Sequence, residues 1–111
     1  MAARARPALE EPALVFEALG DPTRLDLVAR LARGGPQSIT GLTRGSPITR
    51  QAITKHLRVL EGAGLARGIR AGRESRWALE PNRLDVAQRY LETVSKRWDE
   101  ALGRLQRYLE D

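Results

Sequence analysis

The sequence contains no cysteine and only one histidine, His56. Disulfides, thiolate zinc sites and iron–sulfur clusters are therefore excluded, and we expect no metal site and no cofactor. We find no nucleophile paired with a base and no glycine-rich loop of the kind that binds phosphate, so the sequence offers no support for an enzyme. The longest apolar run is the four residues Ala13–Phe16, and the N-terminus lacks the apolar stretch of a secretory signal. These absences predict a soluble, cytoplasmic protein that does not enter a membrane.

The length of 111 residues fits one compact domain and leaves little room for a second. Hydrophobic residues make up 41% of the chain and charged residues 30%, which is typical of a globular protein and not of a disordered one. We expect a flexible N-terminal tail over residues 1–8 and a single domain over residues 9–111.

The charge of the chain is concentrated in one segment. Between Arg44 and Arg76 lie eight basic and two acidic residues, a net charge of +6, whereas the other eleven basic and twelve acidic residues give −1. A solvated surface usually mixes both signs, so this imbalance indicates a polyanionic partner, with nucleic acid favoured over a membrane surface.

Periodicity, capping residues and turn residues predict four helices, a β-hairpin and a long last helix. Their approximate bounds are residues 11–19, 22–33, 38–45, 50–62, 65–79 and 83–109. The expected fold is thus mainly α with a small β-hairpin. This order of elements is that of a winged helix-turn-helix domain, in which the helix after the tight turn enters the major groove of DNA.

The helix predicted over residues 50–62 separates its polar and apolar residues. Thr49 is its expected N-cap, and at about 100° per residue Ile53, Leu57 and Leu60 fall on one side. The opposite arc carries the residues that we expect to contact DNA, which with the cap are Thr49, Arg50, Gln51, Thr54, Lys55 and Arg58. Arginine and glutamine can pair with base edges, and threonine can bind phosphate or contact a thymine methyl group.

Further cations lie in the predicted hairpin. Arg70 and Arg73, near its tip, suit contacts with phosphate or with the minor groove, and Arg76 is a weaker candidate one strand step further. His56 falls between the polar arc and the core, and we interpret it as a boundary residue packed against a neighbouring helix. Trp77 is expected in the core.

The last helix has an apolar repeat with alternating steps of three and four residues. The repeat consists of Leu84, Ala87, Leu91, Val94, Trp98, Ala101, Leu105 and Tyr108. A spacing of 3.5 residues over more than three heptads is typical of a helix that pairs with another helix. We expect it to form the seam of a homodimer, with Leu84, Leu91, Val94, Trp98 and Leu105 in the interface; the alternative is a helix laid across the core of its own domain.

Several segments together resemble the ArsR/SmtB-like family of winged-helix repressors. The segments are Ala18–Leu25, Ile39–Leu42, Thr49–Leu57, Arg58–Leu65 and Gly72–Trp77, and the resemblance runs without gaps from about Leu14. It implies a homodimer joined through the first helix, with Phe16, and the last helix. It also implies binding to an operator in double-stranded DNA, repression of transcription, and base contacts at Arg50, Gln51, Thr54 and Lys55.

The chain departs from this family at the sensor sites. The family's metal sensors use cysteines in the third helix or Asp/His pairs along the last helix, and this sequence has neither pattern. The effector therefore stays unknown. The sequence hypothesis is a sequence-specific DNA-binding regulator, a repressor acting on a near-palindromic operator; the alternative is a winged-helix module whose basic face binds an acidic protein.

Overall fold

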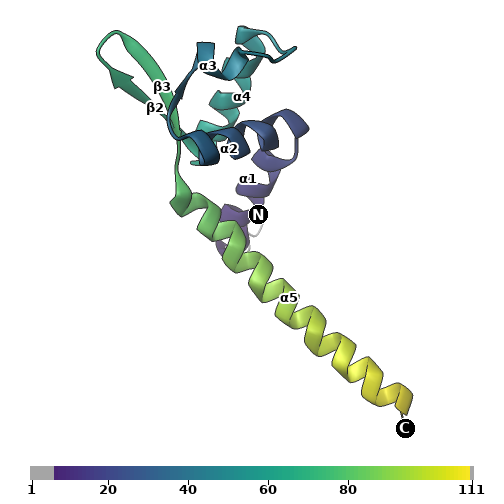
Figure 1. Cartoon of the computed structure of the whole chain (residues 1–111). Helices are drawn as coiled ribbons and strands as arrows, with labels where there is room; N and C mark the ends of the chain where they lie inside the picture. The colour runs from purple at the N-terminus through teal and green to yellow at the C-terminus, as the bar shows by residue number, and fades with distance from the viewer. Residues whose placement is uncertain (1–6, 111) are drawn as a thin grey trace, which may run out of the picture.

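The computed structural model describes residues 7–110, and the first six residues of the expected tail lie outside that range. Figure 1 shows a small body of helices with a β-hairpin projecting on one side and a long helix on the other. The elements in chain order are α1 (Pro7–Leu19), α2 (Pro22–Gly34), β1 (Gln37–Ser38), α3 (Ile39–Thr43), α4 (Arg50–Gly62), β2 (Ala66–Ala71), β3 (Glu74–Leu79) and α5 (Pro81–Glu110).

Helix α1 begins earlier than the sequence predicted. The expected start was Glu11 or Pro12, because a proline inside a helix removes one backbone hydrogen bond. The structure instead starts the helix at Pro7, so Ala8 is helical and not part of a tail. Pro12 lies inside the helix and is buried. The first turn tolerates Pro7 because its backbone nitrogen has no partner to lose there.

Helix α2 has the ends that its sequence predicts. Asp21 is the N-cap, and its Oδ2 accepts a hydrogen bond from the backbone N of Arg24 at 3.0 Å. At the other end the N–H of Gly35 donates to the carbonyl of Leu31, with φ at +71°, a left-handed value that favours glycine. Leu27 and Leu31 face inward and are buried.

A short strand that the sequence did not predict joins the hairpin. Residues Gln37 and Ser38 form β1, which pairs with Trp77 and Arg76 of β3, so the sheet has three antiparallel strands in the order β1-β3-β2. A strand of two residues is too short to show the alternation of polar and apolar residues that predicts a strand, so the sequence contains no signal for β1. Ser38 then caps α3, its Oγ accepting from the N–H of Gly41 at 3.1 Å.

Helix α4 ends in a Schellman motif. The N–H of Leu65 donates to the carbonyl of Leu60, and the N–H of Gly64 donates to the carbonyl of Glu61, both at 2.9 Å. Gly64 has φ +78°, and Leu60 and Leu65 are fully buried beside this turn. The motif sends the chain from α4 directly into β2.

We expect Gly64→Ala to lower the free energy of unfolding by about 1–3 kcal/mol, because alanine resists a positive φ. A Cβ at this position would also lie 2.6 Å from Nε and 2.9 Å from Cγ of Arg83, so that side chain would have to move. Gly62→Ala is the matched control, since it has open space around it and its φ is not positive. Urea unfolding of both variants tests this, and equal stability of the two would contradict it.

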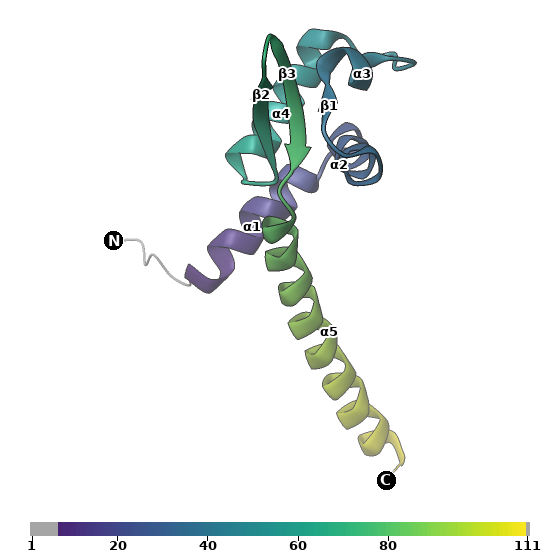
Figure 2. The same ribbon diagram turned by 60° about the vertical axis from the view of Figure 1, so that its left-hand side comes forward.

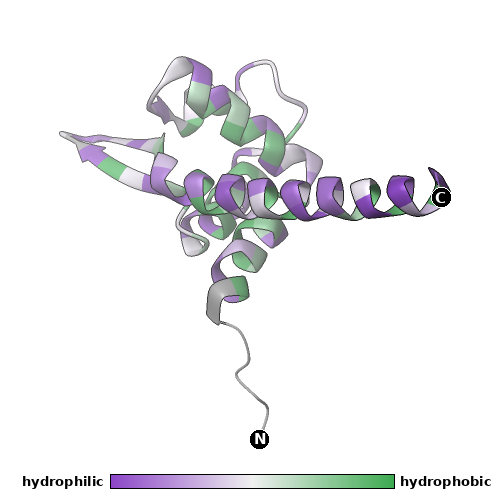
Figure 3. Ribbon diagram, turned by 90° about the horizontal axis from the view of Figure 1, so that it is seen from below, coloured by the Kyte–Doolittle hydropathy of each residue, from purple (hydrophilic) through white to green (hydrophobic). Residues whose placement is uncertain are grey.

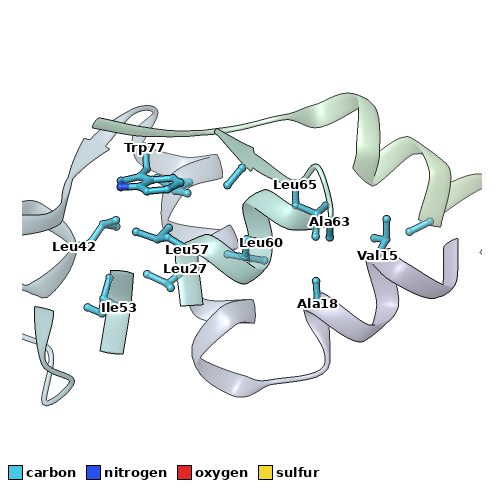
Figure 4. Close-up of a cluster of buried hydrophobic side chains, with 13 residues drawn as sticks. Val15, Ala18, Leu27, Leu42, Ile53, Leu57, Leu60, Ala63, Leu65 and Trp77 are labelled. Carbon is cyan, nitrogen blue, oxygen red and sulfur yellow. The ribbon is translucent and has the colours of Figure 1, made fainter. Parts of the chain in front are cut away.

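The hairpin forms where it was expected. Ala71 pairs with Glu74, which leaves Gly72 and Arg73 as a two-residue turn with Gly72 at φ +64°. Between the hairpin and the helices lies one apolar core (Figure 4). Leu42, Ile53, Leu57, Leu60 and Leu65 are each at most 1% exposed. Trp77 is 6% exposed, which confirms its predicted place in the core.

Helix α5 leaves the body of the domain, as Figures 1 and 2 show. Helix α1 packs along its beginning, where Phe16 and Tyr90 meet edge to face with ring centroids 5.9 Å apart. The rest of α5 projects outward, so the radius of gyration is 18.6 Å, against about 13 Å for a compact domain of 100 residues. The described chain is therefore a compact body with a projecting helical arm.

Candidate nucleic-acid interface

The outward face of α4 carries the polar residues that the sequence predicted to contact DNA. Ile53, Leu57 and Leu60 are buried against the core, so they fix the rotation of the helix about its axis. As a result Arg50, Gln51, Lys55 and Arg58 are exposed and Thr54 is half-buried.

Both threonines of α4 already make a hydrogen bond within the helix. Thr49 Oγ1 accepts from the backbone N of Ala52 at 3.1 Å, which confirms it as the N-cap. Thr54 Oγ1 donates to the carbonyl of Arg50 at 2.9 Å. Thr49 keeps its O–H for donation, and Thr54 keeps its methyl group and lone pairs, so each can still contact DNA in the way predicted for it.

A polar cleft lies between α3, the beginning of α4 and the hairpin tip. Arg50 is held at its edge, because its Nη1 donates to Thr40 Oγ1 of α3 at 2.9 Å. Arg44 and Arg73 line the same cleft, and Glu74 supplies one negative charge. The structure thus brings the start of α4 and the tip of the wing into one basic cleft, and it adds Thr40 and Arg44 to the residues that the sequence singled out for DNA contact.

Two of the predicted cations, one in the wing and one in α4, have an acidic neighbour. Arg76 Nη2 lies 3.3 Å from Glu74 Oε2, and Arg58 Nη1 lies 3.3 Å from Glu61 Oε1. Arg58 also places its guanidinium carbon 5.6 Å from the centre of the Trp77 ring, a cation–π arrangement. These two arginines therefore each form a solvent-exposed ion pair within the domain. Arg70 and Arg73 remain exposed on the hairpin.

A polar junction behind α4 fixes the helix to α1 and α2. Arg24 of α2 donates from Nε to the carbonyl of Ala18, at the end of α1, and its Nη1 lies 3.3 Å from His56 Nδ1 of α4. His56 is thus packed against a neighbouring helix, as the sequence predicted.

The same junction lowers the pKa of Asp21 below its ordinary value of 3.8. The main cause is the hydrogen bond from the backbone N of Arg24, and the nearby His56, whose Nδ1 is 3.9 Å from Asp21 Oδ2, acts in the same direction, while partial burial opposes both. Because the pKa of Asp21 is lower in the folded than in the unfolded protein, its ionised carboxylate stabilises the fold at pH values above the pKa of the unfolded state. That contribution disappears as the pH falls through the folded pKa.

We therefore expect Asp21→Asn to be less stable than the wild type near neutral pH, and the difference to shrink as the pH falls below 3.8, the ordinary pKa of the carboxyl group. Asparagine keeps a good capping side chain and removes only the charge, so the variant isolates the electrostatic part. Urea unfolding at about pH 6 and pH 3 measures the difference. A difference in unfolding free energy that does not change with pH would contradict the assigned cause.

No helix within residues 7–110 has both the length and the hydrophobicity to cross a bilayer. No group of three or more acidic or histidine side chains among the described residues is arranged to hold a metal ion.

Comparisons with known proteins agree with this geometry. A family model described as a helix-turn-helix domain matches residues 19–69. The HTH-type transcriptional regulator Rv2034 of Mycobacterium tuberculosis is 35% identical over 91 residues, which cover 82% of this chain and 81% of that protein.

Solved structures give the same result. The ArsR-like transcriptional regulator from Rhodococcus sp. RHA1 superposes with a TM-score of 0.78 and 36% identity, covering 89% of this chain and 92% of that one. A second structure, of the ArsR family transcriptional regulator RHA00566, has a TM-score of 0.73 and 28% identity, covering 82% of this chain and 93% of the other. The chain belongs to the ArsR-like family of winged helix-turn-helix transcriptional regulators, whose members bind DNA.

Proposed function

We propose that this regulator binds a near-palindromic operator as a homodimer and represses transcription from it. The observation that carries the proposal is the exposed polar face of α4, set beside the basic cleft and the wing. In this arrangement α4 enters the major groove, while Arg70 and Arg73 of the wing follow the phosphate backbone.

Within the major groove we assign the reading of bases to Arg50, Gln51, Thr54 and Lys55. Arg50 suits guanine and Gln51 suits adenine, since each can make two hydrogen bonds to one base edge. We assign phosphate contacts to Thr49, to Arg44 in the cleft, and to Arg58 and Arg76 once they leave their acidic neighbours. Phosphate competes well for such exposed ion pairs, because they contribute little to stability.

The dimer is supported by the apolar face of α5. Leu91, Trp98 and Leu105 are 54%, 65% and 53% exposed, which is unusual for large apolar residues in a regular repeat. A winged helix-turn-helix domain of Mycobacterium bovis with the same fold, 19% identical to this chain, is described as homodimeric. Two-fold symmetry of the protein then predicts two half-sites about one helical turn apart.

Selection of genomic DNA fragments on the purified protein, followed by sequencing, tests the proposal. We expect enrichment of fragments that share a near-palindrome, and repression of a reporter whose promoter overlaps that site. Titration with labelled duplex then measures affinity. If no duplex binds even at about 50 mM salt, where phosphate contacts are strongest, the basic face serves an acidic protein partner instead.

A further inference from the structure

A groove with an apolar wall lies where the first half of α1 passes beside α5. The wall is formed by Leu9 and Pro12 of α1 and by Val86 and Tyr90 of α5. Pro12 is buried, Val86 and Tyr90 are half-buried and Leu9 is exposed, so the wall extends from the interior to the surface. The groove has a volume of about 390 Å³, which is within the range of sites that bind small molecules.

The rest of the lining on α5 is a row of polar residues spaced by one helical turn. Arg89, Thr93 and Arg97 follow one another at intervals of four residues, and all three are exposed. Arg89 Nε donates to the backbone carbonyl of Asp85 at 3.4 Å, which leaves the N–H groups of both terminal nitrogens for a ligand. Neither arginine forms an ion pair with a carboxylate in residues 7–110.

The acidic residue of the lining, Glu11, already has a partner. Its Oε1 lies 3.2 Å from Nη1 of Arg83, which lies outside the lining. The charges of Arg89 and Arg97 are therefore not balanced within the groove. Two guanidinium groups favour an anion, and the apolar wall favours a ligand that also has an apolar part.

The groove and the apolar repeat of α5 lie on different faces of the helix. At about 100° per residue, with Leu84 at 0°, Arg89 falls near 140° and Arg97 near 220°. Leu91 and Trp98 of the repeat fall near 340° and 320° on the same scale. In Figure 3 the hydrophobic stretches of α5 follow one edge of the helix, while much of the side toward the viewer is hydrophilic. A helix paired along the repeat thus contacts a different face from the one that carries the arginines.

We propose that this groove binds a small organic anion with an apolar body, such as an aromatic or medium-chain carboxylate. The carboxylate lies above Thr93, one turn from Arg89 and one turn from Arg97, where both long side chains can donate to it. The apolar body lies against Leu9 and Val86, so the ligand bridges α1 and α5. Binding requires no DNA, and the inference therefore goes beyond the proposed binding of an operator.

Titration calorimetry of the full chain without DNA tests the chemical class of the ligand. The probes are octanoate and 2-naphthoate, each compared with its amide, which has nearly the same shape and no charge. We expect at least one carboxylate to bind once per chain, and its amide to bind about tenfold more weakly, because the charge-assisted hydrogen bonds are lost. If neither carboxylate binds, or if a carboxylate and its amide bind equally, the proposal is overturned.

Two variants test the place of binding. Arg97→Gln should weaken binding of the carboxylate about tenfold and leave the amide unaffected, since it removes one guanidinium group. Leu9→Ala removes part of the apolar wall and should weaken the carboxylate and the amide alike. Both residues are exposed, so urea unfolding of the two variants should match that of the wild type.

Arg33→Gln is the matched control, because it removes the same charge from an exposed position on α2. Its affinity for the carboxylate should equal that of the wild type. Equal losses for Arg97→Gln and Arg33→Gln would show that the anion responds only to the net charge of the chain, and wild-type affinity in both Arg97→Gln and Leu9→Ala would place the anion elsewhere. Either result would overturn the site.

Discussion

Replacing Trp98 with alanine is expected to turn the proposed homodimer into monomers at concentrations where the wild type is dimeric. Trp98 lies at the middle of the apolar repeat, and its side chain is 65% exposed in the single chain. Tryptophans at interface centres cost about 2 kcal/mol or more on truncation, and the dimer loses two of them. The dimer dissociation constant should therefore rise by about a thousandfold, as measured by sedimentation equilibrium.

The same variant should lose most of its affinity for the operator. Two half-sites bound by one dimer gain from the high effective concentration of the second domain, and a monomer has no such gain. Lys96→Ala is the matched control, because Lys96 is exposed on the polar side of the same helix. Stability of the folded domain should change little, since Trp98 packs outside the core. An unchanged dissociation constant would show that Trp98 is not in the interface.

The structure decides one question that the sequence left open. The last helix was expected either to pair with another helix or to lie across its own core. Its beginning does contact the domain, since Ala87 is buried and Tyr90 meets Phe16. Leu91, Trp98, Leu105 and Tyr108 are exposed, so the core of the same chain does not cover the rest of the repeat. The periodicity predicted that the last helix pairs with another helix, but it did not predict how much of the last helix packs against its own domain.

The helices and the wing were predictable because their signals are local. Thr49, Asp21 and Gly64 fix the ends of helices through bonds to residues a few positions away, and Gly72 fixes the turn. These signals led to the winged helix-turn-helix fold, which the structure confirms, and to a DNA-binding regulator rather than an enzyme, which the family confirms.

The parts that could not be predicted depend on residues far apart in the chain. Arg50 reaches Thr40 across the turn between α3 and α4, and Arg58 lies over Trp77 of the wing, so neither contact has a signature in spacing. The cleft shared by Arg44, Arg50 and Arg73 exists only because β3 pairs with β1 beside α3. The individual roles at the DNA surface therefore stay predictions, and they can be separated by experiment.

Gln51→Ala and Arg73→Ala should weaken DNA binding in two different ways. Gln51 is exposed on α4 and can read a base edge, so its loss should reduce the preference for operator over random duplex by about 1–3 kcal/mol. Arg50→Ala should act in the same direction. Arg73, at the wing tip, is assigned to phosphate, so its loss should weaken both duplexes alike.

The dependence on salt distinguishes the two roles further. Each phosphate contact releases counterions, so Arg73→Ala should reduce the slope of log affinity against log salt by about one, while Gln51→Ala leaves it unchanged. Fluorescence anisotropy of operator and random duplex over a range of salt measures both quantities. Arg33→Ala removes the same charge as Arg73→Ala, from an exposed position on α2, and serves as the control for net charge. Equal losses on both duplexes for Gln51→Ala would mean that α4 holds DNA at this position without reading it.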